Sequence, residues 1–179
     1  MSAAQTPSQT VGPFFAIGLS VAAQNELVDA SAPGAVRIIG RVLDGEGVGV
    51  PDAMVEIWQA DASGTYRSDF GWGRCGTDEA GRYSFSTVKP GPVEGRAPQL
   101  TVLVFARGLL KAVHTRMYFP GEEANASDPV LSALDPAERG TLVALPEGLG
   151  DSHVTVTSDG ALRFDIRLQG GGQTTFFAV

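Results

Sequence analysis

The chain has 179 residues, of which 18% are charged, and it contains 23 glycines and 11 prolines. Glycine and proline are the poorest helix formers, so this composition argues against a helical bundle and favours short strands joined by many turns. The formal charge of −7 and the presence of only two lysines, Lys89 and Lys111, exclude the basic surface that nucleic-acid binding requires. The single cysteine, Cys75, excludes an intramolecular disulfide and a cysteine-rich metal site.

The hydrophobic pattern argues against a membrane protein. No apolar stretch approaches the roughly 20 residues that a helix needs to span a bilayer. Residues 1–10 are polar and lack a basic patch followed by an apolar run, so we expect no secretory signal peptide. Length and hydropathy together predict one β-rich domain that is soluble and cytoplasmic.

The first 34 residues show little hydrophobic periodicity, so we divide the chain into an N-terminal arm (1–34) and a β-sandwich domain (35–179). Phe14 and Phe15 follow a Gly-Pro pair and need an apolar surface to pack on, provided by this domain or by another chain. Docking of such an arm on its own domain is the commoner outcome. The residues alone leave both alternatives open.

Four strands are expected in the middle of the chain. Residues 36–43 are apolar and β-branched, and residues 53–59 form a second apolar run after Pro51. Residues 82–87 alternate as a half-buried strand does. Residues 100–105 are continuously apolar, so we expect both faces of that strand to be covered. Turns rich in aspartate and glycine separate these runs.

The last third of the chain begins with helix signals and returns to strands. Asp128 and Asp135 each precede a proline, which predicts the N-termini of two short helices. Residues 161–168 alternate apolar and charged side chains and predict a strand of fixed register. Residues 153–157 are expected to form a hairpin with that strand, and residues 174–179 a final strand. Seven or eight short strands indicate an all-β fold, a β-sandwich.

The residues alone identify no active site. The chain has two histidines, His114 and His153, and neither is in a nucleophile or metal-ligand motif. We interpret His153 as a surface residue and His114 as packed in the core or at an interface. Read in this way, the chain is a β-sandwich without evident chemistry.

Longer motifs indicate a family. The run Val-Glu-Ile-Trp-Gln-Ala-Asp-Ala-Ser-Gly-Thr-Tyr (55–66), with residues 77–91 and 115–119, resembles the core of the intradiol ring-cleavage dioxygenases. These enzymes open catechols with non-haem Fe(III) in a β-sandwich. Residues 6–14 and 163–170 are similar to the metal-free alpha subunits that, in this family, pair with an iron-bearing beta subunit. The resemblance extends along nearly the whole chain.

The resemblance also locates the positions of the family's iron ligands, which are two tyrosines and two histidines. In this chain they correspond to Tyr66, Val93, Gln99 and Thr101, so three of the four ligands are absent. Valine cannot bind a metal, and glutamine and threonine are poor ligands for ferric iron. We therefore expect no metal in this chain and interpret Tyr66 as a leftover, buried with its hydroxyl hydrogen-bonded. Arg116 replaces a glutamine of the catalytic chains.

The resemblance implies that this chain acts through its partner. Fe(III) would be bound by the beta subunit, and protocatechuate and O2 would meet at a shared site to give 3-carboxy-cis,cis-muconate in the β-ketoadipate route. Thr10, Gly12, Pro13 and Arg107 would contribute to the cavity wall, within a higher hetero-oligomer. Arg107 either attracts the substrate carboxylate or forms a structural ion pair. The alternative function is a non-catalytic binding or structural sandwich that inherited the fold.

Overall fold

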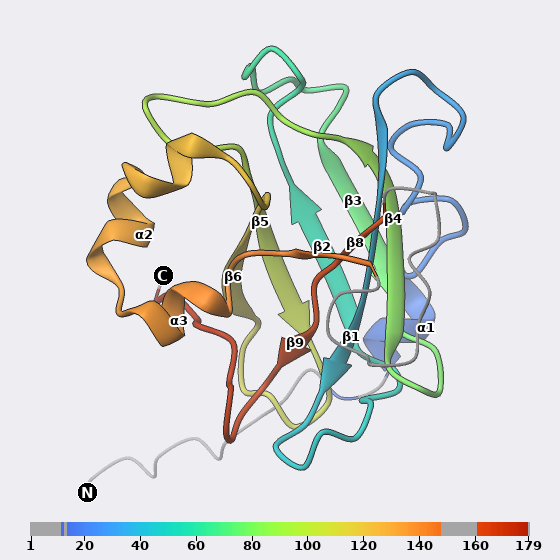
Figure 1. Ribbon diagram of the computed structural model, residues 1–179. Coiled ribbons are helices and arrows are strands. Elements are labelled where there is room, and N and C mark those ends of the chain that lie inside the picture. The colour runs from blue at the N-terminus through green and yellow to red at the C-terminus, as the bar shows by residue number, and fades with distance from the viewer. Residues whose placement is uncertain (1–11, 13, 148–160, 179) are drawn as a thin grey trace, which may run out of the picture.

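A computed structural model describes residues 12, 14–147 and 161–178 (Figure 1). One sheet has the order β4-β1-β8-β7, with β9 also paired to β1, and the other has the order β3-β2-β5-β6. The strands are β1 (Ala35–Leu43), β2 (Met54–Trp58), β3 (Trp72–Gly76), β4 (Arg82–Val88), β5 (Gln99–Phe105), β6 (Val113–Tyr118), β7 (Leu145–Pro146), β8 (Leu162–Arg163) and β9 (Ile166–Arg167). The helices are α1 (Phe14–Leu19), η1 (Glu123–Ala126), α2 (Pro129–Ala133) and α3 (Pro136–Gly140). The all-β sandwich with short helices is confirmed.

The core lies between the two sheets and is built by alternate side chains of each strand. The inward-facing residues of β1, β2, β4 and β5 include Ile38, Val42, Ile57, Tyr83, Phe85, Leu100, Val102 and Val104. In β5 the intervening side chains of Thr101, Leu103 and Phe105 are only half-buried. The expectation that both faces of this strand are covered is therefore wrong. An antiparallel sheet can leave one face partly open to solvent, whatever the polarity of the sequence there.

A second, smaller core lies beneath the helices on one side of the sandwich, where Tyr118, Leu131 and Leu142 are fully buried. Both predicted helix starts are confirmed. The Asp128 carboxylate accepts hydrogen bonds from the first turn of α2, and Asp135 forms a capping box with Glu138 at the start of α3.

The C-terminal segment runs parallel to β1 in one register, with Ile38 opposite Leu162 and Val42 opposite Ile166. The predicted strand over 161–168 is interrupted at Phe164, whose carbonyl accepts a hydrogen bond from the buried Tyr83 hydroxyl at 2.5 Å. The predicted alternation of burial is present only in part: Phe164 and Ile166 are buried, whereas Leu162 and Leu168 are half-buried like the charged residues between them. The 153–157 hairpin and His153 lie outside the described residues. Instead of a strand over 174–179, the described residues form one bridge, between His114 and Phe177.

The described part of the arm packs on its own sandwich. The Phe15 ring lies 6.4 Å from the Phe105 ring, and Arg74 donates a hydrogen bond to the Leu19 carbonyl. Phe14 points outward instead and is 79% exposed. None of the helices in the described ranges is long and apolar enough to cross a membrane. The division into an arm and a domain at residue 34 stays a prediction.

Candidate functional site

Three of the four positions that correspond to iron ligands line one small cavity of about 110 Å³. Tyr66, Val93 and Gln99 meet there, although they come from three different parts of the chain, and Arg96 joins them. Thr101 lies two residues beyond Gln99 on β5 and does not line the cavity. We name this place the vestigial pocket.

A tight turn brings Tyr66 to the vestigial pocket. The Asp61 carboxylate accepts hydrogen bonds from the backbone N–H groups of Ser63 and Thr65 at 2.9 and 3.0 Å and from the Ser63 hydroxyl at 2.6 Å. The hydrogen bonds with Ser63 and Thr65 hold the pKa of Asp61 below its ordinary value. Gly64 has a φ of +84°, and a Cβ there would lie 2.4 Å from the carbonyl oxygen of Pro92. The turn therefore needs glycine to pack against the loop that carries Val93.

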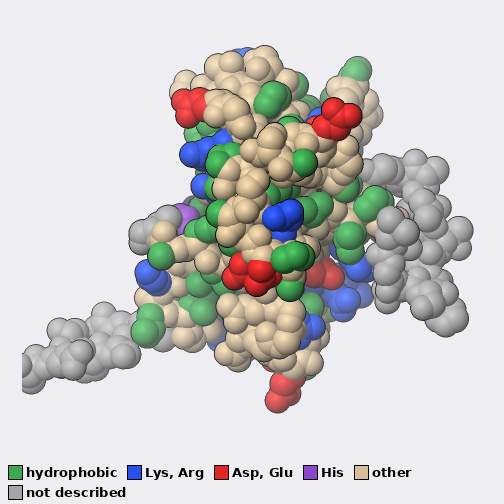
Figure 2. Space-filling view, turned by 60° about the vertical axis from the view of Figure 1, so that its left-hand side comes forward, with side chains coloured by type: hydrophobic (Ala, Val, Ile, Leu, Met, Phe, Trp, Pro, Cys, Tyr) green, Lys and Arg blue, Asp and Glu red, His purple; other side chains and the backbone are tan. Residues whose placement is uncertain are grey.

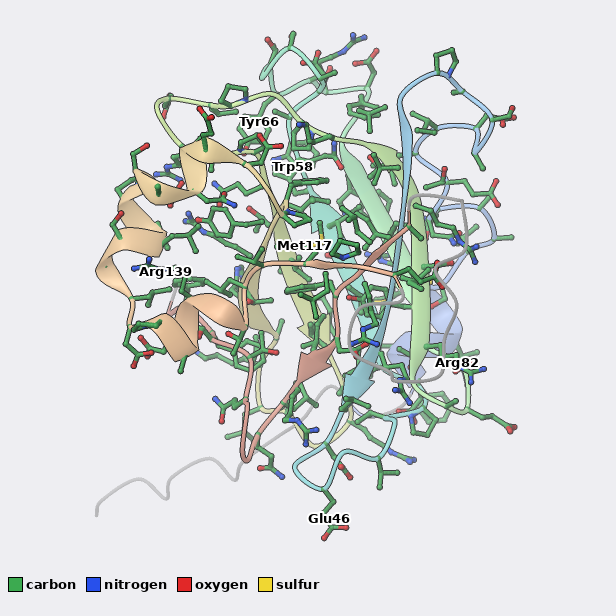
Figure 3. The ribbon with its side chains drawn as sticks, viewed as in Figure 1. Glu46, Trp58, Tyr66, Arg82, Met117 and Arg139 are labelled. Carbon is green, nitrogen blue, oxygen red and sulfur yellow. The ribbon has the colours of Figure 1, made fainter. Side chains whose placement is uncertain are left out.

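Tyr66 is not buried, contrary to expectation. Its side chain is 47% exposed, and its ring stacks on Trp58 with 5.9 Å between centroids and 8° between planes. Figure 3 shows the two rings together at one end of β2. Trp58 also lies opposite Trp72 across the β2–β3 pair, and both indoles are partly exposed. The partner of the tyrosine is thus an exposed aromatic side chain and not the core.

The residues of the vestigial pocket do not fit ferric iron. Val93 has no donor atom, and the Gln99 amide oxygen accepts a hydrogen bond from the Arg116 guanidinium at 3.3 Å. Arg116 is also paired with Thr101 across β5 and β6. Apart from the phenol of Tyr66, the described lining offers only the carboxylate of Glu94 as a strong ligand. A cation in this place would also meet the positive charges of Arg96 and Arg116. Within the described ranges, no group of three or more His, Cys, Asp and Glu side chains could hold a metal ion.

The residues expected to line a partner's cavity lie elsewhere. Thr10 and Pro13 are outside the described residues. Gly12 has a φ of +68° and precedes α1, whose Phe15 packs on Phe105 at the end of β5. Arg107 follows Phe105 by two residues, is 58% exposed, and forms an ion pair with Asp52 at 3.4 Å. The ion pair is thus within this chain, and more than half of the Arg107 side chain remains exposed.

These two groups lie at opposite ends of one strand. Gln99 begins β5, and Phe105 ends it. A strand rises about 3.4 Å per residue, so the two ends lie about 20 Å apart. Gly12, Phe15 and Arg107 therefore belong to one end of the second sheet, and the vestigial pocket belongs to the other end.

The sequence motifs did not predict that two arginines would lie close to the positions of the missing iron ligands. Arg96 lines the vestigial pocket, and Arg116 bonds to Gln99. Arg116 was identified only as a departure from the family, and its bond to Gln99 depends on the pairing of β5 with β6. The alternation of β2 contains a weak signal for the exposed Trp58, because Val55 and Ile57 are buried and residues 56 and 58 take the other face.

Comparison with known proteins agrees with this geometry. A family model described as "Dioxygenase" matches residues 11–170. The "Protocatechuate 3,4-dioxygenase alpha chain" of Pseudomonas putida is 39% identical over 97% of this chain and 96% of its own length. The "Protocatechuate 3,4-dioxygenase beta chain" of Burkholderia cepacia is 34% identical over 61% of this chain and 54% of its own length. A solved dioxygenase domain, from a fusion with a carbohydrate-binding protein in Streptomyces sp. SirexAA-E, aligns with a TM-score of 0.66 and 28% identity over 93% of this chain and 99% of its own.

An identity of 39% over nearly the whole chain confirms the resemblance expected from the motifs. The sandwich is of the intradiol dioxygenase type. The chain belongs to the intradiol ring-cleavage dioxygenase family and, within it, groups with the alpha chains.

Proposed function

We propose that this chain is the metal-free alpha subunit of a cytoplasmic protocatechuate 3,4-dioxygenase and completes a catalytic site whose iron is held by a beta subunit. The carrying observation is the separation along β5. The positions equivalent to iron ligands lie at one end, and the described cavity-wall positions, Gly12 and Arg107, belong to the other. An arm that lined the vestigial pocket of its own chain would have to reach the end of β5 at Gln99, whereas Phe15 contacts Phe105 at the opposite end.

The role of the arm follows from its chemistry. The ferric iron of the beta subunit supplies the activation of the catechol toward O2. The Gly12-Pro13 corner offers a small, rigid wall for a flat ring, because glycine leaves the backbone bare and proline fixes φ. The exposed guanidinium of Arg107 attracts the carboxylate that distinguishes protocatechuate from catechol.

The contact with the beta subunit would use the outer side of α1. Phe14 and Ile17 are 79% and 78% exposed, and Val21 after the helix is also largely exposed. Phe15 meanwhile fixes the helix to Phe105. Exposed side chains of this size that cluster on one short segment are typical of a protein interface. Assembly into a higher hetero-oligomer is part of the same proposal.

Deletion of the arm tests the proposal. The chain lacking residues 1–15 and a control lacking only residues 1–5 are each co-expressed with a beta chain, and protocatechuate turnover is measured together with complex formation by size exclusion. We expect the longer deletion to lower kcat/KM at least tenfold. The control should retain activity. Unchanged turnover by a stable complex without residues 1–15 would overturn the cavity-wall role.

The alternative, a non-catalytic sandwich, is favoured by the vestigial pocket alone. It predicts that this chain does not alter the turnover of a beta chain with which it is mixed. The acidic charge of the chain makes nucleic acid an unsuitable partner, and described acidic and basic side chains are interspersed on the face shown in Figure 2.

A further inference from the structure

A second cavity, separate from the vestigial pocket and from the arm, lies over the outer face of the first sheet. It has a volume of about 630 Å³ and lies over β1, β4 and β8, with β3 along one side. Four arginines line it: Arg37, Arg41, Arg82 and Arg163. We call it the arginine groove. Figure 3 labels Arg82, on the side of the molecule where β4 lies.

The strand register gathers these arginines around one apolar residue. Ile39 points to the outer face, and Arg37 and Arg41 precede and follow it on the same face of β1. Arg41 is directly opposite Arg82 on β4, and Ile39 is directly beside Arg163 on β8. Like charges directly opposite each other in a sheet are destabilising. The register of β1 with β4 therefore places two like charges opposite each other.

Among the described residues of the groove, carboxylates are fewer than arginines. Asp78 and Asp165 line it, but one oxygen of each accepts backbone hydrogen bonds, from Ala80 and Arg82 for Asp78 and from Arg41 for Asp165. The other oxygen of Asp165 lies 3.6 Å from Arg163. Among the described residues, the guanidinium groups of the other three arginines have no carboxylate within ion-pair distance. Among the described residues that line the groove, four side chains are positive and two are negative, in a chain whose total formal charge is −7.

We propose that the arginine groove binds a small organic polycarboxylate. Its volume lies within the roughly 300–1,000 Å³ of small-molecule sites. The guanidinium fork suits carboxylates bidentately. Residues 37 and 41 are about 14 Å apart along an extended strand, so a ligand with several carboxylates can contact more of these arginines than a single phosphate can. A carbon skeleton with separated carboxylates can rest on Ile39 and reach several arginines.

Citrate, a tricarboxylate, is a suitable probe. Thermal unfolding of the full chain is followed at constant ionic strength with 0 to about 1 mM citrate, a concentration too low for general salt stabilisation. Titration calorimetry gives the Kd. The variants are Arg41→Gln and Arg82→Gln, with Arg67→Gln as the control, because Arg67 is equally a surface arginine but pairs with Asp69 away from the groove.

We expect citrate to raise the Tm of the unsubstituted chain and of Arg67→Gln, and its Kd to rise at least tenfold in Arg41→Gln and Arg82→Gln. Without citrate, these two variants should unfold at the same or a higher temperature than the unsubstituted chain, because a like-charge pair is removed. That result separates lost binding from misfolding. Inorganic phosphate at the same ionic strength should bind at least tenfold more weakly than citrate.

Three results would overturn the proposal. The first is an equal Kd for citrate in all variants, and the second is equal binding of phosphate and citrate. The third is a loss of beta-chain affinity in Arg41→Gln with no citrate binding, which would make the groove a docking surface for an acidic protein segment. None of these outcomes bears on the arm or on Arg107, so the two proposals fail independently.

Discussion

Replacing Asp128 by alanine should destabilise the protein far more than removal of an ordinary helix cap. The side chain is fully buried and accepts four hydrogen bonds. One carboxylate oxygen takes the N–H groups of Val130 and Leu131 and the hydroxyl of Tyr118 at 2.9, 3.1 and 3.1 Å. The other takes the N–H of Ala97 at 3.0 Å. Asp128 thus ties α2, β6 and the loop before β5 together.

The magnitude follows from these contacts. Loss of an N-cap costs about 0.5–2 kcal/mol. Each buried donor left without a partner costs about 1–3 kcal/mol, and here the N–H of Ala97 and the hydroxyl of Tyr118 are both orphaned. Some water entry into the space that the carboxylate leaves offsets part of this cost. We expect a total loss of about 3–5 kcal/mol in the free energy of unfolding.

Asp135 provides the matched control, because it also precedes a proline at a helix start but is exposed. Asp135→Ala should cost about 1 kcal/mol. Equilibrium unfolding in urea at pH 7 measures both variants, with circular dichroism as the probe. Equal losses for the two variants, or a loss below about 2 kcal/mol for Asp128→Ala, would refute the reasoning from burial.

Two further predictions concern Tyr118 and Arg107. Burial raises the pKa of Tyr118 to about 12 from its ordinary 10, so the folded state holds the phenol proton more tightly than the unfolded state. The resulting contribution to the free energy of unfolding is full below pH 10 and is lost as the pH rises toward 12, at about 1.4 kcal/mol per pH unit. Urea unfolding between pH 9 and 12 should therefore show that Tyr118→Phe loses stability with pH less steeply than the unsubstituted chain. Equal slopes for the two proteins would contradict this prediction. Arg107→Ala should raise KM for protocatechuate about tenfold more than it raises KM for catechol. Asp52→Asn removes only the ion pair and should not produce this difference. An equal effect of Arg107→Ala on both substrates would indicate a purely structural arginine.

The strands with alternating side chains could be predicted from the sequence, but β3 could not. It contains Gly73 and Gly76, which remove the side chains that would reveal a period of two. The structure shows why glycine is needed at Gly73. A Cβ there would lie 2.5 Å from the Leu27 side chain and 3.1 Å from the carbonyl oxygen of Gln24, so the arm would have to shift away from this strand. Gly73 is therefore a place where the arm approaches β3 closely.

The family motifs pointed to Tyr66, Val93, Gln99 and Thr101, of which the first three line the vestigial pocket, but the motifs did not predict its electrostatics. Gln99 and Arg116 are 17 residues apart, and only the register of β5 with β6 brings their side chains together. The exposure of Tyr66 could not be predicted either, because its stacking partner Trp58 belongs to a run that is apolar in the sequence. Motifs give the identity of site residues, whereas cross-strand partners depend on the register.

The central claim is that this chain supports catalysis at iron held by another chain. Metal analysis of the chain purified alone and in complex with a beta chain tests it most directly, with the visible absorption of tyrosinate-bound Fe(III) as a second readout. We predict no stoichiometric iron and no such absorption in the isolated chain, and one iron per alpha–beta pair in the complex. One iron per isolated chain, with the tyrosinate absorption, would contradict the account.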